Sequence, residues 1–210
     1  MRAAEPGNAT AVFSMLSYVG SLSQPDELAD GAPEIAFIGR SNVGKSSLLN
    51  ALCAHRKVAR TSKTPGRTQR VHIFDAIDPS GVALRLADLP GYGHARTPVA
   101  VRQGFGPMIE GYLLGRRTLT VVLLLWDARR DPDEDTLGFL LWLREANLRV
   151  RLVVTKLDKV ARNRQHGRLL ALKKAMELDD VPLGTSVTTG EGVEALRNYV
   201  VRCAAEAGRA

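Results

Sequence analysis

A glycine-rich stretch that starts at residue 39 has the residue types and the spacing needed to hold phosphates. It reads GRSNVGKSS and fits the pattern G-x4-G-K-S. Glycines let backbone N–H groups converge on phosphate oxygens, the lysine bridges the terminal phosphates, and the serine hydroxyl binds Mg²⁺. A glycine-rich turn can match by chance, but here an apolar run precedes the stretch and a helical pattern follows it. We therefore predict a phosphate-binding loop, here called the phosphate loop, made of Gly39, Arg40, Ser41, Asn42, Val43, Gly44, Lys45 and Ser46.

A second motif, TKLD, ends another apolar run and has the chemistry to select a base. The carboxylate of Asp158 can accept the ring N–H and the exocyclic amine of guanine, a pair of donors that adenine lacks. We expect the alkyl chain of Lys156 to lie along the base and its ammonium to reach toward the phosphate loop. We also expect Thr155 to join the strand end to that loop by hydrogen bonding. Lys-x-Asp is also common in surface turns, but its order after the phosphate loop favours guanine recognition. The predicted guanine-binding residues are Thr155, Lys156, Leu157 and Asp158.

A third motif, DLPG, lies between the other two in the sequence. Asp88 is expected to hold Mg²⁺ through water, and the N–H of Gly91 to sense the terminal phosphate. In several nucleotide switches a glutamine follows this glycine and orients the attacking water, but here the residue is Tyr92. In isolation the motif reads as an ordinary turn, and its position favours the functional interpretation. The residues assigned to the site are Asp88, Leu89, Pro90 and Gly91.

Two further segments have open interpretations. The basic loop over residues 55–70 carries three hydroxyls that qualify chemically to complete a Mg²⁺ shell, those of Thr61, Thr64 and Thr68. The same loop is either a solvated segment or a basic lip that docks on RNA phosphates. The backbone N–H groups of Thr185, Ser186 and Val187 are placed to meet the 6-oxo group of guanine, although a turn followed by a helix cap explains the same residues.

Alternating apolar runs and helical patterns predict an α/β fold. Strands are expected at residues 34–39, 71–77, 82–90, 119–128, 149–158 and 182–187, and helices at 45–53, 133–146, 164–178 and 192–207. The second and third strands form a hairpin through the turn DPSG, and the remaining strands alternate with helices. The predicted architecture is a three-layer phosphate-loop domain with a mostly parallel six-stranded sheet, one antiparallel edge strand and helices on both faces.

Composition narrows the class of protein. The chain has 210 residues and a net charge of +7, which favours polyanionic partners as well as simple solubility. Its two cysteines, Cys53 and Cys203, have no metal-binding spacing and are expected to be reduced and buried. The N-terminus makes a poor signal peptide, and the most apolar run, residues 119–126, is too short to span a bilayer. We expect a cytoplasmic protein without a membrane span.

Taken in order, GRSNVGKSS, SKTPGRTQ, DLPGYG, TKLD and TSV resemble the translation-factor-related GTPases. The sequence is most similar to the EngB (YihA/YsxC) family of bacterial ribosome-assembly and cell-division GTP-binding proteins, within the TrmE-Era-EngA-EngB-septin-like superfamily. The similarity covers roughly residues 20–205. It implies a single GTP-binding G domain over residues 31–206, preceded by an arm over residues 1–30 that packs on it.

The resemblance also implies specific roles. GTP or GDP would bind with Mg²⁺, which Ser46, Asp88 and Thr68 would hold, Thr68 being the switch hydroxyl. The catalytic group would comprise Lys45, Thr68 and Gly91, together with Asn42, which in some related GTPases coordinates K⁺ near the phosphates. Val187 stands where relatives often have a small residue, which implies weaker guanine binding. Further nucleotide contacts would come from Gly66, Arg67, Thr68, Gln69 and Arg70.

The same resemblance implies a monomeric switch in the assembly of the large ribosomal subunit, required for normal septation. The tyrosine at position 92 in place of glutamine predicts slow intrinsic turnover, on the order of 10⁻⁴–10⁻³ s⁻¹. One alternative is a GTP-binding scaffold at the division septum with negligible turnover. Another is a phosphate-loop kinase or ATPase, which Asp158 and the lack of an arginine-rich lid argue against.

Overall fold

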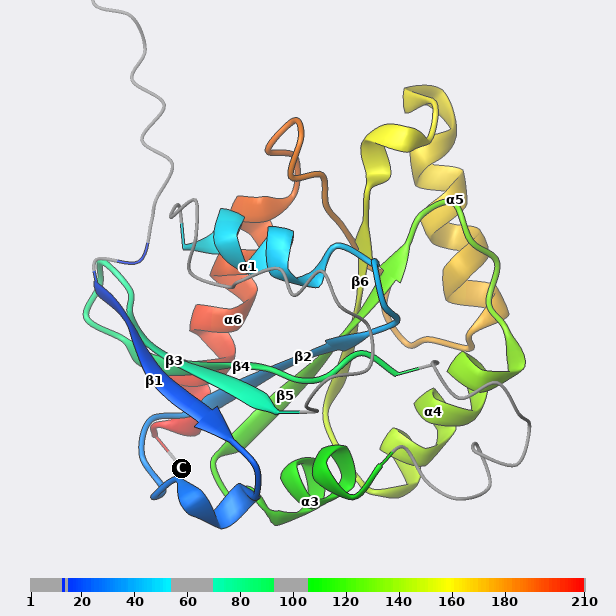
Figure 1. Cartoon of the computed structure of the whole chain (residues 1–210). Helices are drawn as coiled ribbons and strands as arrows, with labels where there is room; N and C mark the ends of the chain where they lie inside the picture. The colour runs from blue at the N-terminus through cyan, green and yellow to red at the C-terminus, as the bar shows by residue number, and fades with distance from the viewer. Residues whose placement is uncertain (1–12, 14, 54–69, 93–105, 210) are drawn as a thin grey trace, which may run out of the picture.

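The computed structural model describes residue 13 and residues 15–53, 70–92 and 106–209, and its centre is one mixed sheet (Figure 1). In the described part of the chain, seven strands lie in the order β1-β3-β4-β2-β5-β6-β7. Strand β3 is antiparallel to both β1 and β4, and the other neighbours are parallel. The strands are β1 (Met15–Leu22), β2 (Glu34–Gly39), β3 (Val71–Ile77), β4 (Ala83–Asp88), β5 (Leu119–Asp127), β6 (Val150–Thr155) and β7 (Leu183–Gly184).

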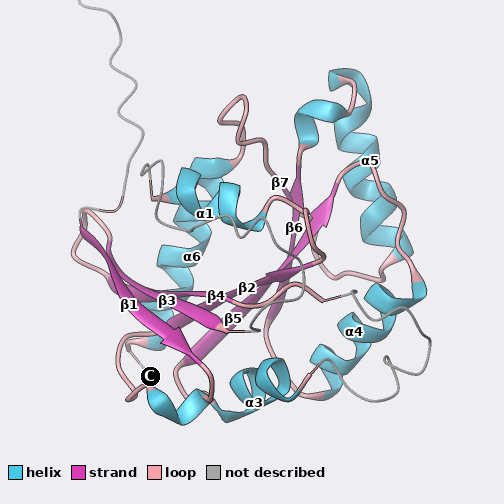
Figure 2. Cartoon of the chain, in the orientation of Figure 1, coloured by secondary structure: helices cyan, strands magenta, loops and turns pink. Residues whose placement is uncertain are grey.

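Helices cover both faces of this sheet, as Figure 2 shows. Helices α1 and α6 pack on one face of the sheet and form one apolar core with it. Helices α3 and α4 and the end of α5 pack on the opposite face and form a second apolar core. Two short 3-10 turns, η1 (Pro25–Glu27) and η2 (Leu157–Lys159), complete the described elements. The helices are α1 (Lys45–Leu52), α3 (Pro107–Gly115), α4 (Glu134–Glu145), α5 (Arg162–Ala175) and α6 (Val193–Ala207). The predicted three-layer fold is confirmed.

The central strands form because their sequences are apolar on both sides. Every residue of β2 is buried, as are residues 121–127 of β5, which is the pattern of a parallel strand covered on both faces. Both cysteines are free and lie in one apolar core, Cys53 after α1 and Cys203 on α6, which confirms their expected burial. Because parallel strands end at the same edge, β2, β5 and β6 deliver their following loops to one end of the molecule. No described helix is long and apolar enough to cross a membrane.

One strand and one α-helix were not predicted. Strand β1 lies within the expected N-terminal arm and adds a seventh strand to the predicted six. It is an edge strand with a bulge near Val19, and exposed apolar side chains such as Met15 and Tyr18 interrupt the alternating pattern. Helix α3 has nine residues with a glycine at its centre and another at its end, so its helical pattern is weak. Its burial against the sheet, through Ile109, Tyr112 and neighbours, stabilises it instead.

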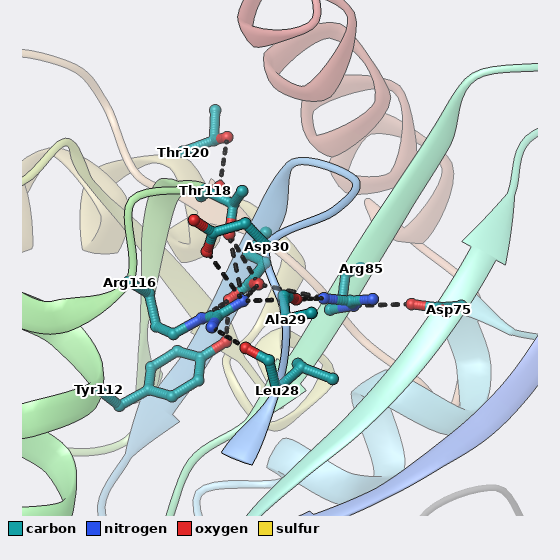
Figure 3. A network of polar contacts seen from close by, with 10 residues as sticks. Leu28, Ala29, Asp30, Asp75, Arg85, Tyr112, Arg116, Thr118 and Thr120 are labelled. Atoms are coloured by element: carbon teal, nitrogen blue, oxygen red, sulfur yellow. Dashed lines mark hydrogen bonds and ion pairs between the residues drawn. The ribbon is translucent and has the colours of Figure 1, made fainter. Parts of the chain in front are cut away.

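A buried polar network joins α3 to the sheet at the end opposite the loops just described (Figure 3). Glu34, at the start of β2, is fully buried and accepts hydrogen bonds from Tyr112, Arg116 and Thr118, the last at 2.7 Å. Arg116 also donates to the carbonyl oxygen of Leu28. The network therefore fastens the segment before β2 to the C-terminal end of α3.

Candidate nucleotide-binding site

The phosphate loop connects β2 to α1, as predicted, and its glycines are required by its shape. A Cβ on Gly39 would lie 2.8 Å from the carbonyl oxygen of Leu125, so no other residue fits between the loop and β5. Gly44 has a φ of 106° and precedes α1 directly. No side chain caps this helix, which leaves the first-turn N–H groups directed at the loop, as an anion requires.

Lys45 and Asp88 meet at the mouth of this loop. Asp88 ends β4, which pairs in parallel with β2 so that Asp88 lies opposite Phe37. The ammonium of Lys45 forms an ion pair with the Asp88 carboxylate, and their side chains are 14% and 8% exposed. The structure thus brings together the lysine of one motif and the acid of another, which the sequence separates by 43 positions.

Gly91 lies against the phosphate loop, where a side chain would fit only if its neighbours shifted by a few tenths of an ångström. A Cβ at this position would be 3.1 Å from the Ser41 hydroxyl and 3.3 Å from the carbonyl oxygen of Gly39. The next residue, Tyr92, forms an isolated parallel bridge with Arg40. The start of this segment is therefore held beside the phosphate loop by backbone contacts, and residues 93–105 lie outside the described part of the chain.

The side chain of Tyr92 packs on α4. It is 5% exposed, its ring centre lies 4.8 Å from that of Phe139, and its hydroxyl donates to the Thr136 hydroxyl over 3.5 Å. Burial raises its pKa to about 12. Phe139 in turn stacks on Trp142 with ring centres 5.8 Å apart. Tyr92 is therefore an apolar anchor that lies where a catalytic glutamine stands in other switches.

The phosphate loop is joined to the same helix. Asp133 caps α4 by accepting the N–H of Thr136 at 3.0 Å, and its second carboxylate oxygen forms an ion pair with Arg40. Both the phosphate loop and the segment after Gly91 are thus connected to the first turns of α4. An Asp three positions before Thr136 is a recognisable cap signature, but the sequence pattern alone does not predict its pairing with Arg40.

The TKLD motif is fixed to the phosphate loop, as predicted. Thr155 donates its hydroxyl to the carbonyl oxygen of Val43 at 2.6 Å and also lies 3.1 Å from that of Trp126. Lys156 has a φ of 57°, and its ammonium donates to the carbonyl oxygen of Asn42 at 2.6 Å and to Asp127 at 3.0 Å. Hydrogen bonds from Arg129, and then from Lys156, lower the pKa of Asp127 well below its usual range. A pocket of about 170 Å³ between these elements is lined by Arg40, Asn42, Trp126, Asp127 and Lys156, among others.

Asp158 is oriented by a residue from the last motif. The hydroxyl of Ser186 donates to one carboxylate oxygen at 2.7 Å, and Lys159 lies 3.2 Å from the other. The hydrogen bond from Ser186, together with Lys159, lowers the pKa of Asp158. A carboxylate has about four acceptor positions, so the ionised group retains the capacity to accept two further N–H donors.

In the TSV motif, two of the three backbone N–H groups already donate hydrogen bonds within the fold. The N–H of Thr185 donates to Val154 at 2.6 Å and that of Ser186 to Glu191 at 2.9 Å. Among the described residues, the N–H of Val187 donates to no backbone oxygen, and its side chain is 42% exposed. Of the three N–H groups predicted to meet guanine, Val187 supplies the one without a backbone partner.

The remaining predicted residues fall in three places. Ser46 lies half-buried in the first turn of α1, while Leu89 and Leu157 are buried in the core. Arg70 donates to the Ser21 hydroxyl on β1 at 3.2 Å, which is a contact within the sheet edge. The expected nucleotide contacts Gly66, Arg67, Thr68 and Gln69 lie outside the described residues, as do Thr61 and Thr64.

Comparison with known proteins agrees with this geometry. Residues 34–156 match the family described as 50S ribosome-binding GTPase. Probable GTP-binding proteins EngB are 41% identical over 193 residues in Syntrophus aciditrophicus, covering 91% of this chain and 96% of the relative, and 48% identical over 149 residues in Trichlorobacter lovleyi, covering 70% and 73%. The chain belongs to the EngB family of GTP-binding proteins.

Solved structures support the EngB fold. A crystal structure of a probable GTP-binding protein EngB aligns with a TM-score of 0.61 at 25% identity, over 82% of this chain and 99% of that one. Aquifex aeolicus Era bound to GDP and AlF₄⁻ aligns with a TM-score of 0.65 at 22% identity, over 81% of this chain and 56% of that one, which shows the fold alone.

Several contacts of this EngB-family site were not predicted from sequence. They include the ion pair of Arg40 with Asp133, the pairing of Lys156 with Asp127, and the hydroxyl of Ser186 on Asp158. Each joins residues at least 28 positions apart, so no local pattern reports it. Asp127, which ends the apolar run at residues 119–127, could have been predicted as a site residue, because polar residues at the ends of parallel strands face the site.

Proposed function

We propose that this chain is a Mg²⁺-dependent GTPase of slow intrinsic rate that works as a switch in the assembly of the large ribosomal subunit. The observation that carries the proposal is the pair of short bonds from the TKLD motif to the phosphate loop, Thr155 to Val43 and Lys156 to Asn42, both at 2.6 Å. They fix the base-selecting and phosphate-holding halves of one site relative to each other. A ligand with guanine and phosphates is the chemistry that satisfies both halves.

Guanine selectivity rests on Asp158. Its carboxylate is kept ionised and oriented by Ser186, so that the ring N–H and exocyclic amine of guanine find acceptors. An adenine ring would leave the carboxylate without these donors, and sites of this type reject such analogues by large factors. The N–H of Val187 is the donor proposed for the 6-oxo group.

The residues present suit magnesium. The hydroxyl of Ser46 and the carboxylate of Asp88 are oxygen donors, the kind that Mg²⁺ prefers while it keeps several waters and binds substrate phosphates. Ser46 and Asp88 would hold it, with Thr68 proposed as the third group. When bound, Mg²⁺ neutralises charge on the phosphates. Asp88 pairs with Lys45 in the structure, so the acid and the cation that serve the phosphates are already adjacent.

Slow turnover is supported by Tyr92. A buried tyrosine packed on α4 has no amide that could orient the attacking water. Another group must therefore position this water. We propose that Lys45 and the N–H of Gly91 stabilise the terminal phosphate. K⁺ held by the side chain of Asn42 would supply the missing charge. Equal turnover in K⁺ and Na⁺ would remove the potassium part of the proposal.

The ribosomal role is supported by the family description and the net charge of +7. We propose that the monomeric protein binds precursors of the large subunit in its GTP state and leaves them after hydrolysis. Normal septation would then depend on this cycle. Ordering of the region around Thr68 by GTP would be the change that the partner detects.

Three measurements test the proposal. Calorimetry with Mg²⁺ should show binding of GTP and GDP but not of ATP, and comparable ATP binding would end it. Sedimentation with large ribosomal subunits should be stronger with a non-hydrolysable GTP analogue than with GDP and should weaken at high salt. Turnover should rise when subunits are added. If GTP binds but neither sedimentation nor turnover responds, the septal scaffold becomes the better interpretation.

A further inference from the structure

The first turn of α4 connects two segments that the proposed reaction uses. The phosphate loop reaches this turn through the side chain of Arg40, and the segment after Gly91 reaches the helix through Tyr92. Asp133, the N-cap of α4, is the residue that pairs with the arginine. It belongs to none of the nucleotide-binding motifs and lies 93 positions from Arg40 in the sequence. Its contacts indicate a role beyond capping the helix.

Asp133 divides its two carboxylate oxygens between the helix and the phosphate loop. One oxygen accepts the backbone N–H of Thr136 at 3.0 Å and the hydroxyl of the same residue at 2.7 Å. The other oxygen forms the ion pair with Arg40, whose side chain is 23% exposed. A cap needs only the first oxygen, and asparagine would cap the helix as well. Glu134 and Asp135 already supply negative charge to the first turn, so the helix does not depend on a charge at Asp133.

The contacts of Asp133 belong to a closed ring that includes the start of the segment after Gly91. The backbone of Arg40 forms the parallel bridge with Tyr92, and the aromatic ring of Tyr92 packs on Phe139 of α4. The hydroxyl of Tyr92 also donates to that of Thr136, which is fully buried and donates to Asp133. The ion pair with Arg40 closes the ring. The phosphate loop and Tyr92 therefore cannot shift relative to α4 without loss of at least one of these contacts.

The ring determines where the backbone of Gly91 lies, because this glycine directly precedes the bridged residue. A Cβ on Gly91 would be 3.3 Å from both the backbone nitrogen of Ser41 and the carbonyl oxygen of Gly39, so its backbone is close to the phosphate loop. The proposed function assigns the N–H of Gly91 to the terminal phosphate. Such a donor is effective only when its position is fixed before the reaction, and a displacement of about 1 Å can reduce a rate by about 100-fold.

We propose that Asp133 is a positioning residue for GTP hydrolysis, which acts through Arg40 to hold the phosphate loop and the N–H of Gly91 in the geometry that the terminal phosphate requires. The inference rests on the proposed function, because the role exists only if a terminal phosphate reacts at this site. Asp133 itself contacts no reacting atom in this scheme. Its removal should therefore slow the reaction of GTP and leave the binding of GDP, which has no terminal phosphate, unchanged.

A neighbouring acid provides a matched control. Asp135 lies in the same turn, and its carboxylate is 3.9 Å from the same guanidinium of Arg40, with a side chain that is 43% exposed. It forms no hydrogen bond with any described residue, so it has the electrostatic part of the contact without the ring. An exposed pair of this kind contributes little to stability and holds no fixed geometry. A role that depended on charge alone would make the two aspartates equivalent.

The test compares Asp133→Asn with Asp135→Asn in the full-length protein. Each change removes one negative charge from the same helix end, and asparagine at position 133 retains the cap. Hydrolysis of GTP with Mg²⁺ and K⁺ gives kcat and KM, calorimetry gives the affinity for GDP, and urea unfolding reports folding. Arg40→Gln, the double variant Arg40→Gln with Asp133→Asn, and Arg40→Lys complete the set.

We expect Asp133→Asn to lower kcat about 10-fold with KM and GDP affinity within about 2-fold of the wild type, because the lost positioning matters only in the transition state. Asp135→Asn should change kcat by less than about 2-fold. The double variant should lose no more than the worse of its two single variants, because both remove the same contact. Arg40→Lys should recover part of the rate lost in Arg40→Gln, since the lysine keeps the charge but not the planar fork.

Equal effects of Asp133→Asn and Asp135→Asn on kcat would overturn the inference, as would losses that multiply in the double variant. A fall in GDP affinity by the same factor as kcat would show a structural role only and would also overturn it. In each of these cases the wild type still hydrolyses GTP, so the proposed function stands. Wild-type protein that binds GTP without hydrolysing it would instead end the proposed GTPase activity, and the positioning role with it.

Discussion

The buried carboxylate of Glu34 offers the sharpest test of what holds the fold together. Replacement by glutamine keeps the volume but places an NH₂ donor among the donors of Arg116, Tyr112 and Thr118. Removing one partner of a buried ion pair costs about 3–5 kcal/mol, because the other charge stays buried. For a chain of this size that corresponds to a fall in Tm of roughly 6–20 °C.

Urea unfolding with and without GDP measures this. The matched control is Asp75→Asn, which removes the exposed partner of Arg85 and should cost about 0–1 kcal/mol. Glu34 lies at the end of the sheet opposite the phosphate loop, so folded Glu34→Gln should bind GDP like the wild type. A loss below about 1 kcal/mol, no larger than the control, would refute the reasoning that the network is an interdependent buried unit.

The same residue predicts a pH dependence. Burial alone raises the pKa of Glu34, but the hydrogen bonds from Arg116, Tyr112 and Thr118 together bring it below its usual value of 4.5. Because the folded pKa is the lower one, this stabilisation is present above about pH 4.5 and is lost as pH falls below it. Glu34→Gln should therefore flatten the acid limb of the stability curve, and an unchanged limb would count against the assignment.

Four further variants, at three positions, probe the site. Tyr92→Phe should unfold in urea like the wild type, since the hydroxyl bond is long, whereas Tyr92→Ala should lose about 3–5 kcal/mol; similar losses in both would place the energy in the hydroxyl. Asp158→Asn should weaken GTP about 100-fold or more by calorimetry and improve xanthine nucleotide binding, and retained GTP affinity would contradict the guanine assignment. Thr155→Val should cost about 1–3 kcal/mol because the Val43 carbonyl oxygen loses a buried donor, and a neutral result would show that water replaces it.

Local spacing made much of the site predictable. The phosphate loop, TKLD and DLPG each need a fixed backbone shape within a few residues, so the local sequence is enough to predict that shape. The expected bonds of Thr155 and Lys156 to the phosphate loop were confirmed because strand order brings β6 beside β5, and β5 beside β2. The apolar runs of β2 and β5 likewise indicated buried parallel strands.

What could not be predicted depends on distant partners. Strand β1 is stabilised by pairing with β3 and helix α3 by burial, and neither has a strong local pattern. Glu34 reads as an ordinary charged residue until Arg116, 82 positions away, is placed beside it. The direction of the Tyr92 side chain is set by Phe139 on α4, which no spacing near DLPG reveals.

The two tryptophans of the chain are connected to the nucleotide-binding motifs, Trp126 through Thr155 and Trp142 through Phe139 and Tyr92, so they can report on the site by fluorescence. The carbonyl oxygen of Trp126 accepts from Thr155, and Trp126 is one of the residues around the pocket beside the phosphate loop. Trp142 stacks on Phe139, which touches Tyr92. Native emission should therefore change both when the base-binding motif shifts and when Tyr92 is displaced from Phe139, and a Trp142→Phe protein would separate the two signals without any added dye.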